Sequence, residues 1–141
     1  MAYDHGRGTV ILFGGRRTDP FVGDFEENDT WSFDGEAWTE ISIPSNERPS
    51  NRTGHVMAYD AGRQRIVLHG GRGVGQDRLD TWEWDGAVWT LMDDPAAAGA
   101  RPGERSDHEM AYRAGEIILF GGQIGGSTLS NMWRWAGHET P

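Results

Sequence analysis

The chain has 141 residues, the size of one ordinary domain, and its 22 acidic side chains outnumber 13 basic ones to give a formal charge of −9. Every basic residue is arginine and there is no cysteine, which excludes lysine Schiff-base chemistry, disulfides and thiolate-bound metals. The acidic balance argues against nucleic acid and anionic membranes as partners. We find neither a signal-peptide pattern nor an apolar run near the roughly 20 residues of a membrane helix, and expect a soluble, cytoplasmic chain.

The first unit, residues 1–43, sets a pattern that returns twice. An apolar run at residues 10–13 ends in Gly14-Gly15, and aromatic segments around Trp31 and Trp38 flank Asp34-Gly35. Asp-Gly between two such segments is a strong hairpin signal, because both residues tolerate positive φ. These features predict short antiparallel strands joined by tight turns.

The second unit, residues 52–93, contains the complete pattern. Its four predicted strands cover residues 55–60, 65–69, 81–84 and 88–92. The third unit, residues 105–137, repeats the pattern as far as Trp133 but lacks the fourth strand. Trp31, Trp82 and Trp133 recur at a constant interval of 51 residues, and no helical periodicity of useful length occurs. The sequence therefore predicts an all-β fold of three repeated units.

The second strand of each unit indicates how the units are arranged. Residues 10–13 and 117–120 are apolar on both faces, which is typical of a strand that lies between two layers. In units of about 50 residues the layers are the neighbouring units, as in a β-propeller. We expect the sheets to pack through Ile11, Phe13, Ile66, Leu68, Ile117 and Leu119.

The second unit resembles a kelch repeat, with Arg52 and His55 at its start, then Gly70-Gly71, then Trp82 and Trp89. The third unit carries the same markers at Arg105, His108, Gly121-Gly122 and Trp133. The resemblance covers nearly the whole chain. It implies kelch-type β-propeller blades, three four-stranded blades per chain, of which the first and the last are incomplete. For function it implies a protein-binding module or, less often, an enzyme.

Three blades leave two blade faces uncovered, because propellers typically contain four to eight blades. Two chains side by side would give six, and we expect a homodimer that completes a six-bladed propeller. The expected seams lie around residues 10–13 and around Trp133 and Trp135. The alternative is a fragment of a longer repeat array, since Met1 aligns with Met57 and Met110.

We interpret the periodic polar and aromatic residues as scaffold. Arg52 and Arg105 are expected to bond backbone carbonyls at the ends of the blades, where their repetition argues against catalysis. His69 occupies the position of Phe13 and Phe120 and is expected to be a hydrogen-bonded core residue. The tryptophans are expected to pack between blades.

The segments that follow the Gly-Gly pairs, residues 16–28, 72–79 and 123–130, differ in length and chemistry. Loops on a rigid scaffold are where recognition usually resides. The candidate binding residues are Arg16, Arg17, Asp19, Phe21, Phe25, Arg72, Asp77, Arg78 and Gln123. Solvated loops without a ligand are the alternative interpretation.

We find no catalytic or metal-binding motif, and we predict a non-enzyme without cofactor or metal. The kelch enzymes that use copper with a cysteine-modified tyrosine are excluded by the absence of cysteine. The favoured function is a protein- or peptide-binding or assembly module. The alternative is a carbohydrate-binding or carbohydrate-active propeller that uses tryptophan and acidic residues at its central opening. The lysine-free, arginine- and glycine-rich usage is typical of a GC-rich bacterial gene.

Overall fold

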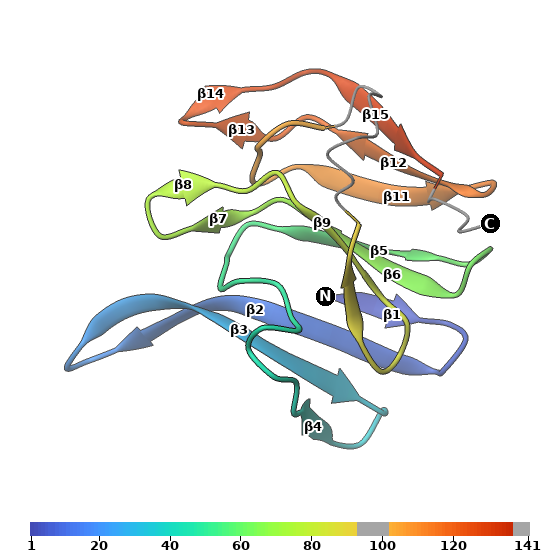
Figure 1. Ribbon diagram of the computed structural model, residues 1–141, viewed down its shortest axis with the longest axis horizontal. Coiled ribbons are helices and arrows are strands. Elements are labelled where there is room, and N and C mark those ends of the chain that lie inside the picture. The colour runs from blue at the N-terminus through green and yellow to red at the C-terminus, as the bar shows by residue number, and fades with distance from the viewer. Residues whose placement is uncertain (93–101, 137–141) are drawn as a thin grey trace.

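The computed structural model describes residues 1–92 and 102–136, and within these ranges every regular element is a β-strand. Figure 1 shows the strands in sheets that follow one another in chain order. The first sheet comprises β1 (Ala2–Asp4), β2 (Thr9–Asp19), β3 (Gly23–Phe33) and β4 (Trp38–Ile41). The second comprises β5 (Val56–Asp60), β6 (Arg65–His69), β9 (Thr81–Trp84) and β10 (Trp89–Leu91). The third comprises β11 (Glu109–Arg113), β12 (Glu116–Phe120) and β15 (Met132–Trp135).

Two short hairpins extend from the second and third sheets. They consist of β7 (Arg72–Gly73) with β8 (Gln76–Asp77), and β13 (Gln123–Ile124) with β14 (Ser127–Thr128). Every pairing is antiparallel, and the first strands of neighbouring sheets contact each other. The predicted all-β fold is confirmed.

The Asp-Gly turns form as their chemistry predicts. In the second sheet the Asp85 carboxylate accepts hydrogen bonds from the backbone N–H groups of Ala87 (2.8 Å) and Val88 (2.9 Å). Asp34 forms the same turn between β3 and β4. Gly35 and Gly86 have φ of 106° and 100°, in the left-handed region where glycine is favoured. The local sequence thus determines these two reversals.

The segment at residues 16–28 is a hairpin, which corrects the expectation of a loop. After a register shift between Phe13 and Gly15, β2 and β3 stay paired as far as Asp19 and Gly23. Glycine at both positions of the shift accommodates positive φ, 50° at Gly14 and 113° at Gly15, so that the ladder continues beyond the bulge. The result is a long arm that extends beyond the first sheet (Figure 1).

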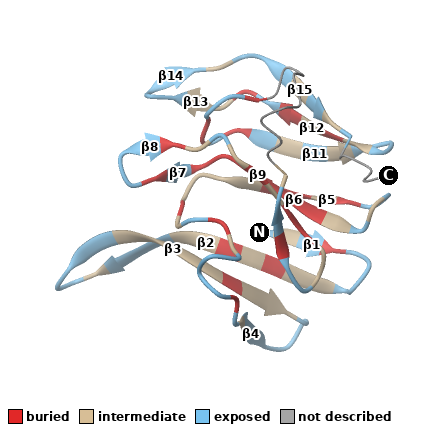
Figure 2. Cartoon of the chain, viewed as in Figure 1, coloured by how far each residue is buried: buried red, intermediate tan, exposed pale blue. Residues whose placement is uncertain are grey.

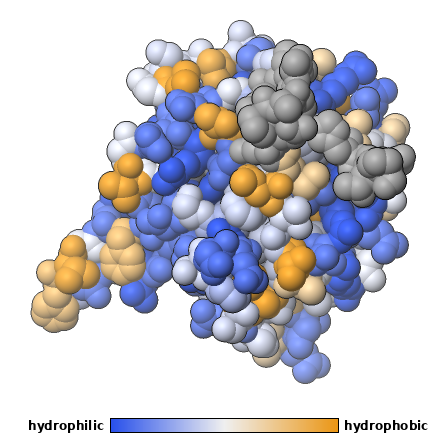
Figure 3. Space-filling view, in the orientation of Figure 1, coloured by the Kyte–Doolittle hydropathy of each residue, from blue (hydrophilic) through white to orange (hydrophobic). Residues whose placement is uncertain are grey.

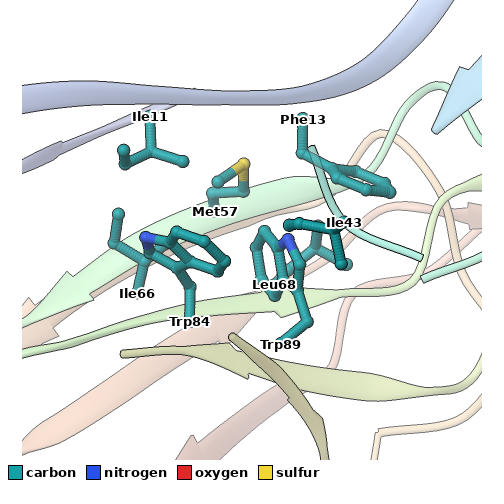
Figure 4. Close-up of a cluster of buried hydrophobic side chains, with 8 residues drawn as sticks. All are labelled: Ile11, Phe13, Ile43, Met57, Ile66, Leu68, Trp84 and Trp89. Atoms are coloured by element: carbon teal, nitrogen blue, oxygen red, sulfur yellow. The ribbon is translucent and has the colours of Figure 1, made fainter. Parts of the chain in front are cut away.

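The larger core lies between the first and second sheets (Figure 4). Alternation along β2 turns Ile11 and Phe13 towards the second sheet, where they are 3% and 2% exposed. Trp84 and Trp89 meet them from β9 and β10, with Phe13 and Trp89 ring centroids 5.4 Å apart. The predicted packing of these tryptophans between sheets is confirmed.

A smaller core lies between the second and third sheets. Val67 and Ile117 are fully buried there, and Trp135 packs against them. The Trp135 indole N–H also donates to the Glu83 carboxylate (3.2 Å). All six residues predicted to join the sheets are buried. Figure 2 shows that buried positions gather in the middle sheet.

The outer faces of the first and third sheets remain open. The first sheet presents Val10 and Leu12, which are half-buried, and Trp38, which is 46% exposed. The third sheet presents Phe120 and Met132, which are more than half exposed. This corrects the expected seam at Trp133 and Trp135, because their side of the third sheet already faces the second sheet, in register with Leu119 and Ile117.

Three leucines at one repeat position allow a matched test of this packing. Leu68 and Leu119 are 0% and 3% exposed, whereas Leu12 lies on the open face. We expect Leu68→Ala and Leu119→Ala to lower the free energy of unfolding by about 2–5 kcal/mol, the range for a large-to-small change in a core. Leu12→Ala should cost about 1 kcal/mol or less in a dilute, monomeric sample, because less of its side chain leaves water. Urea denaturation measures the three values, and equal losses would contradict the assignment of faces.

Candidate binding site

Each of the first two Gly-Gly pairs forms a backbone hydrogen bond with the segment that begins the next repeat. The Gly15 N–H donates to the Arg52 carbonyl (2.9 Å), and the Arg52 N–H donates to the Glu27 carbonyl (3.1 Å). In the next sheet, Gly71 N–H donates to the Arg105 carbonyl (2.8 Å) and Arg105 N–H donates to the Arg78 carbonyl (3.0 Å). We call each arrangement a clip: Gly14-Gly15 with Arg52, and Gly70-Gly71 with Arg105.

The arginine side chains connect the clips to the following sheets. The fully buried Arg52 guanidinium donates to the Gly70 carbonyl (2.9 Å) and to both carboxylate oxygens of Asp80 (2.7 Å each). Although burial favours the neutral acid, these hydrogen bonds hold the pKa of Asp80 below its ordinary value. Arg105 donates to the Gly121 carbonyl (2.9 Å) and to Asn131 (3.1 Å). The prediction that these arginines bond backbone carbonyls is confirmed.

The clips place the variable segments at one end of the sheets. The arm formed by β2 and β3 and the two short hairpins all follow a Gly-Gly pair and lie on the same side in Figure 1. Glycine is required at the junction, because a Cβ at Gly70 would lie 2.4 Å from the Arg105 carbonyl oxygen. The candidate binding residues are therefore mounted on a rigid junction.

The arm is stabilised by its own charged residues. Arg16 pairs with Asp24, and Arg17 pairs with Glu27 (3.1 Å) while its guanidinium lies 4.7 Å from the centroid of the Phe25 ring. The Asp19 carboxylate accepts the N–H groups of Phe21 (2.8 Å) and Val22 (3.0 Å), and these bonds lower its pKa. The two residues at the tip, Phe21 and Val22, are 94% and 78% exposed. Figure 3 shows this apolar tip projecting from the body of the molecule.

The two short hairpins are connected by Asp77. Although burial raises the pKa of Asp77, its hydrogen bonds lower it overall, the largest of them from the Gly125 N–H (2.9 Å). Ser106 and Arg72 also donate to this carboxylate, at 3.0 and 3.2 Å. Arg72, Asp77 and Gln123 line one open groove of about 560 Å³.

The structure thus divides the predicted residues into two groups. Arg16, Arg17, Asp19, Phe21 and Phe25 lie on the arm, whereas Arg72, Asp77 and Gln123 lie at the groove between the short hairpins. Arg78 contributes mainly through its backbone, in the second clip.

Sequence reasoning missed Gln76, Glu104 and Ile124 among the side chains that line the groove, and it missed Ser106, which bonds to Asp77 beside it. No sequence signal connects Ser106 with Asp77, because their contact joins two repeats.

Three histidines lie near the clips, of which His69 and His108 are buried and His55 is half-buried. Burial lowers the pKa of His55 and of His69 to about 3, and that of His108 to about 4. His69 shares a 2.9 Å hydrogen bond with the Thr81 hydroxyl, which confirms its predicted role as a hydrogen-bonded core residue. All three rings are neutral at pH 7.

The described residues contain neither a group of metal ligands nor a membrane-spanning helix. No three histidine, aspartate or glutamate side chains there are grouped so that they could hold a metal ion. The same part of the chain contains no helix with the length and apolarity needed to cross a membrane.

Two comparisons with known proteins agree on one family. A family model described as the KLHDC2/KLHL20/DRC7 kelch-repeats domain matches residues 2–136. The chain is also similar to dynein regulatory complex subunit 7 of Chlamydomonas reinhardtii, with 37% identity over 82 residues. That alignment covers 57% of this chain and 7% of the algal protein, so the similarity concerns a small part of its length.

The buried histidines predict a loss of stability in acid. Their folded pKa values of about 3 to 4 lie below the ordinary value of 6.5, so the unfolded chain binds protons first as the pH falls. Each histidine should remove up to about 1.4 kcal/mol per pH unit between pH 6.5 and its folded pKa. His69→Phe, which matches Phe13 and Phe120, should make the slope shallower by about that amount.

Urea denaturation from pH 8.5 to 4.5 measures these slopes. Above pH 7.5 the two proteins should have parallel pH dependences, because the histidines are then neutral in both states. An unchanged slope below pH 6.5 in His69→Phe would count against a neutral, buried His69.

Proposed function

The chain belongs to the kelch-repeat family, and from this premise we propose that it is a non-catalytic binding and assembly module, with blades at residues 1–43, 52–93 and 105–137. Kelch repeat domains are generally protein-interaction modules. The algal relative is by name a subunit of a complex, which supports such a role. A cytoplasmic location is part of the same proposal.

The observation that carries the assembly is the complementarity of the two open faces. Within the chain, the side of the second sheet with Ile66 and Leu68 packs against the first sheet, and the corresponding side of the third sheet packs against the second. The open face of the first sheet carries Val10 and Leu12 at those same repeat positions.

The open face of the third sheet carries the other half of this interface. Ile118 and Phe120 stand where Ile11 and Phe13 stand in the first sheet, which pack on the sheet that follows. The third sheet of one copy would therefore pack against the first sheet of another copy in the same way as neighbouring sheets pack within one chain. Two copies joined at two such seams would form six blades, and apolar burial would favour this closure by roughly 25 cal/mol per Å².

The end that carries the arm and the short hairpins is the proposed site for a protein or peptide ligand. It offers an exposed aromatic tip at Phe21, arginines at positions 16, 17 and 72, and an open groove beside Asp77. Exposed aromatic and arginine side chains are the residues that contribute most at protein interfaces. No observation favours the carbohydrate alternative, since Trp84, Trp89 and Trp135 pack between sheets.

The assembly predicts a mass of two chains. Size-exclusion chromatography with light scattering at micromolar concentration should give twice the 15.7 kDa of one chain. Leu12→Asp and Ile118→Asp should each give a monomer, because each places a carboxylate in both seams. Mixing the two variants should restore dimers through the one seam that both leave intact.

Val22→Asp is the matched control, because it places the same charge on the tip of the arm, and it should remain dimeric. Circular dichroism checks that each variant is folded. A stable monomer or a mass of three chains in the wild type would refute the six-bladed dimer.

The ligand site predicts a dependence on three arginines. Peptides selected from a displayed random library on the wild-type chain should bind the triple variant Arg16→Ala, Arg17→Ala, Arg72→Ala at least tenfold more weakly, since guanidinium contacts contribute strongly at interfaces. The control variant Arg65→Ala, Arg113→Ala, Arg134→Ala loses the same charge away from the Gly-Gly end and should bind them normally. Selected peptides that bind both variants equally well would remove the ligand site from this end.

A further inference from the structure

The third Gly-Gly pair differs from the other two, because among residues 1–92 and 102–136 no Arg-x-x-His segment lies against it. Residues 52–55 lie against Gly14-Gly15, and residues 105–108 lie against Gly70-Gly71. Gly122 stands where Gly15 and Gly71 donate to an arginine carbonyl, and no such partner is found for it in the described ranges. The third pair is therefore a clip without its arginine segment.

Phe120 shows what the missing segment would cover. In the first clip the His55 ring packs on Phe13, with centroids 5.6 Å apart, and in the second His108 packs on His69 at 5.5 Å. Phe13 and His69 are each 2% exposed, whereas Phe120, at the same repeat position, is 54% exposed. The third position thus lacks the histidine ring that covers its counterparts.

Among the described residues, the space beside Gly121 is also open. A Cβ at Gly14 or Gly70 would lie 3.0 or 2.4 Å from an arginine carbonyl oxygen. At Gly121 the nearest atom to such a Cβ is the Leu129 carbonyl oxygen, at 3.4 Å. A groove of about 400 Å³ lies here and is lined by Phe120, Gly121, Gly122 and Leu129. A small side chain at Gly121 would enter the groove without meeting the docked backbone that occupies the other two clips.

The groove presents backbone groups in the register of the filled clips. In the second clip, the Arg78 N–H donates to the Gly71 carbonyl (2.7 Å), and the Arg78 carbonyl accepts the Arg105 N–H. In the third sheet, the Leu129 N–H donates to the Gly122 carbonyl (2.8 Å) in the same way. The Leu129 carbonyl is thus the counterpart acceptor. The Asp107 N–H donates to the Gly54 carbonyl of the preceding segment (2.8 Å), which makes the Asp107 carbonyl the next acceptor in the series.

The charges of the groove suit a basic segment. Asp107 and Glu109 line it, and no basic residue of the described ranges does. The first sheet carries a matching carboxylate: Asp29 accepts the Trp31 indole N–H (2.6 Å) as Asp80 accepts that of Trp82 (2.8 Å). Asp80 also pairs with Arg52, whereas no arginine pairs with Asp29 in the described ranges. Asp29 is therefore the counterpart of the carboxylate that receives Arg52.

We infer that the groove beside Phe120, Gly121 and Gly122 is a docking site for an extended Arg-x-x-His peptide segment presented by another polypeptide chain. The backbone carbonyl of its arginine accepts the Gly122 N–H, and the backbone N–H of that arginine donates to the Leu129 carbonyl. Its histidine ring packs on Phe120. The groove lies on one chain, so backbone docking needs no second copy. The contact of the arginine side chain with Asp29 rests on the proposed pairing of open faces.

A synthetic peptide with the sequence of residues 49–59, labelled with fluorescein, is the probe, and fluorescence anisotropy measures its binding to the full chain. The wild-type chain should bind it, and a peptide with Arg52→Gln should bind at least tenfold more weakly. Gly121→Ala should weaken binding at least tenfold by occupying the path of the peptide backbone. Gly8→Ala is the matched control, because Gly8 has φ of 72° against 68° for Gly121 and a Cβ there meets nothing within 4 Å.

Phe120→Ala is a second variant, which removes the platform for the histidine and should also weaken binding without inserting a side chain into the groove. No binding by the wild type, or normal binding by both Gly121→Ala and Phe120→Ala, would overturn the inference. Equal binding of the glutamine peptide would overturn it where light scattering shows the wild type to be a dimer, because only the dimer brings Asp29 to the arginine. Light scattering of the wild type and of Leu12→Asp separates the two proposals. If the open faces do not pair, both proteins have the mass of one chain. If the groove does not bind the segment, the masses are as expected and only the peptide titration fails.

Discussion

The fold depends on a guanidinium that is wholly removed from water. Arg52 sits at the boundary between the first two sheets, and its charge is tolerated because Asp80 and the Gly70 carbonyl surround it with acceptors. Its backbone meanwhile bonds to Gly15 and Glu27 of the preceding sheet. One residue therefore fixes two sheets relative to each other. The positions of the segments that leave the first two Gly-Gly pairs follow from this junction and from its counterpart at Arg105.

Much of the fold could be predicted from the sequence because its signals are local. The Asp-Gly turns form through carboxylate contacts two and three residues away, and alternation identifies Ile66 and Leu68 as core. The constant spacing of the tryptophans shows that the same structural unit is repeated along the chain. The buried role of His69 likewise follows from its position in a row of phenylalanines.

The remaining features depend on contacts between repeats or on which face of a sheet packs against its neighbour. Alternation separates the two faces of the third sheet but does not tell which one meets the second sheet, and so Trp135 was assigned to the wrong side. The arm was missed although oppositely charged residues, such as Arg17 and Glu27, recur at cross-strand spacing. The contacts of Asp77 with Ser106 and Gly125 join different repeats, and no sequence spacing predicts them.

The exchange of one acid for an amide makes the two clips unequal. Arg52 is neutralised by Asp80, whereas Arg105 meets Asn131 and carries its charge into a buried position where burial lowers its pKa. In a stack of repeats each junction opens with its own free energy, and the weaker junction opens first. The third sheet should therefore separate from the second before the second leaves the first. The expected order of local unfolding thus starts at the third sheet, whose clip lacks the carboxylate that neutralises Arg52 in the first.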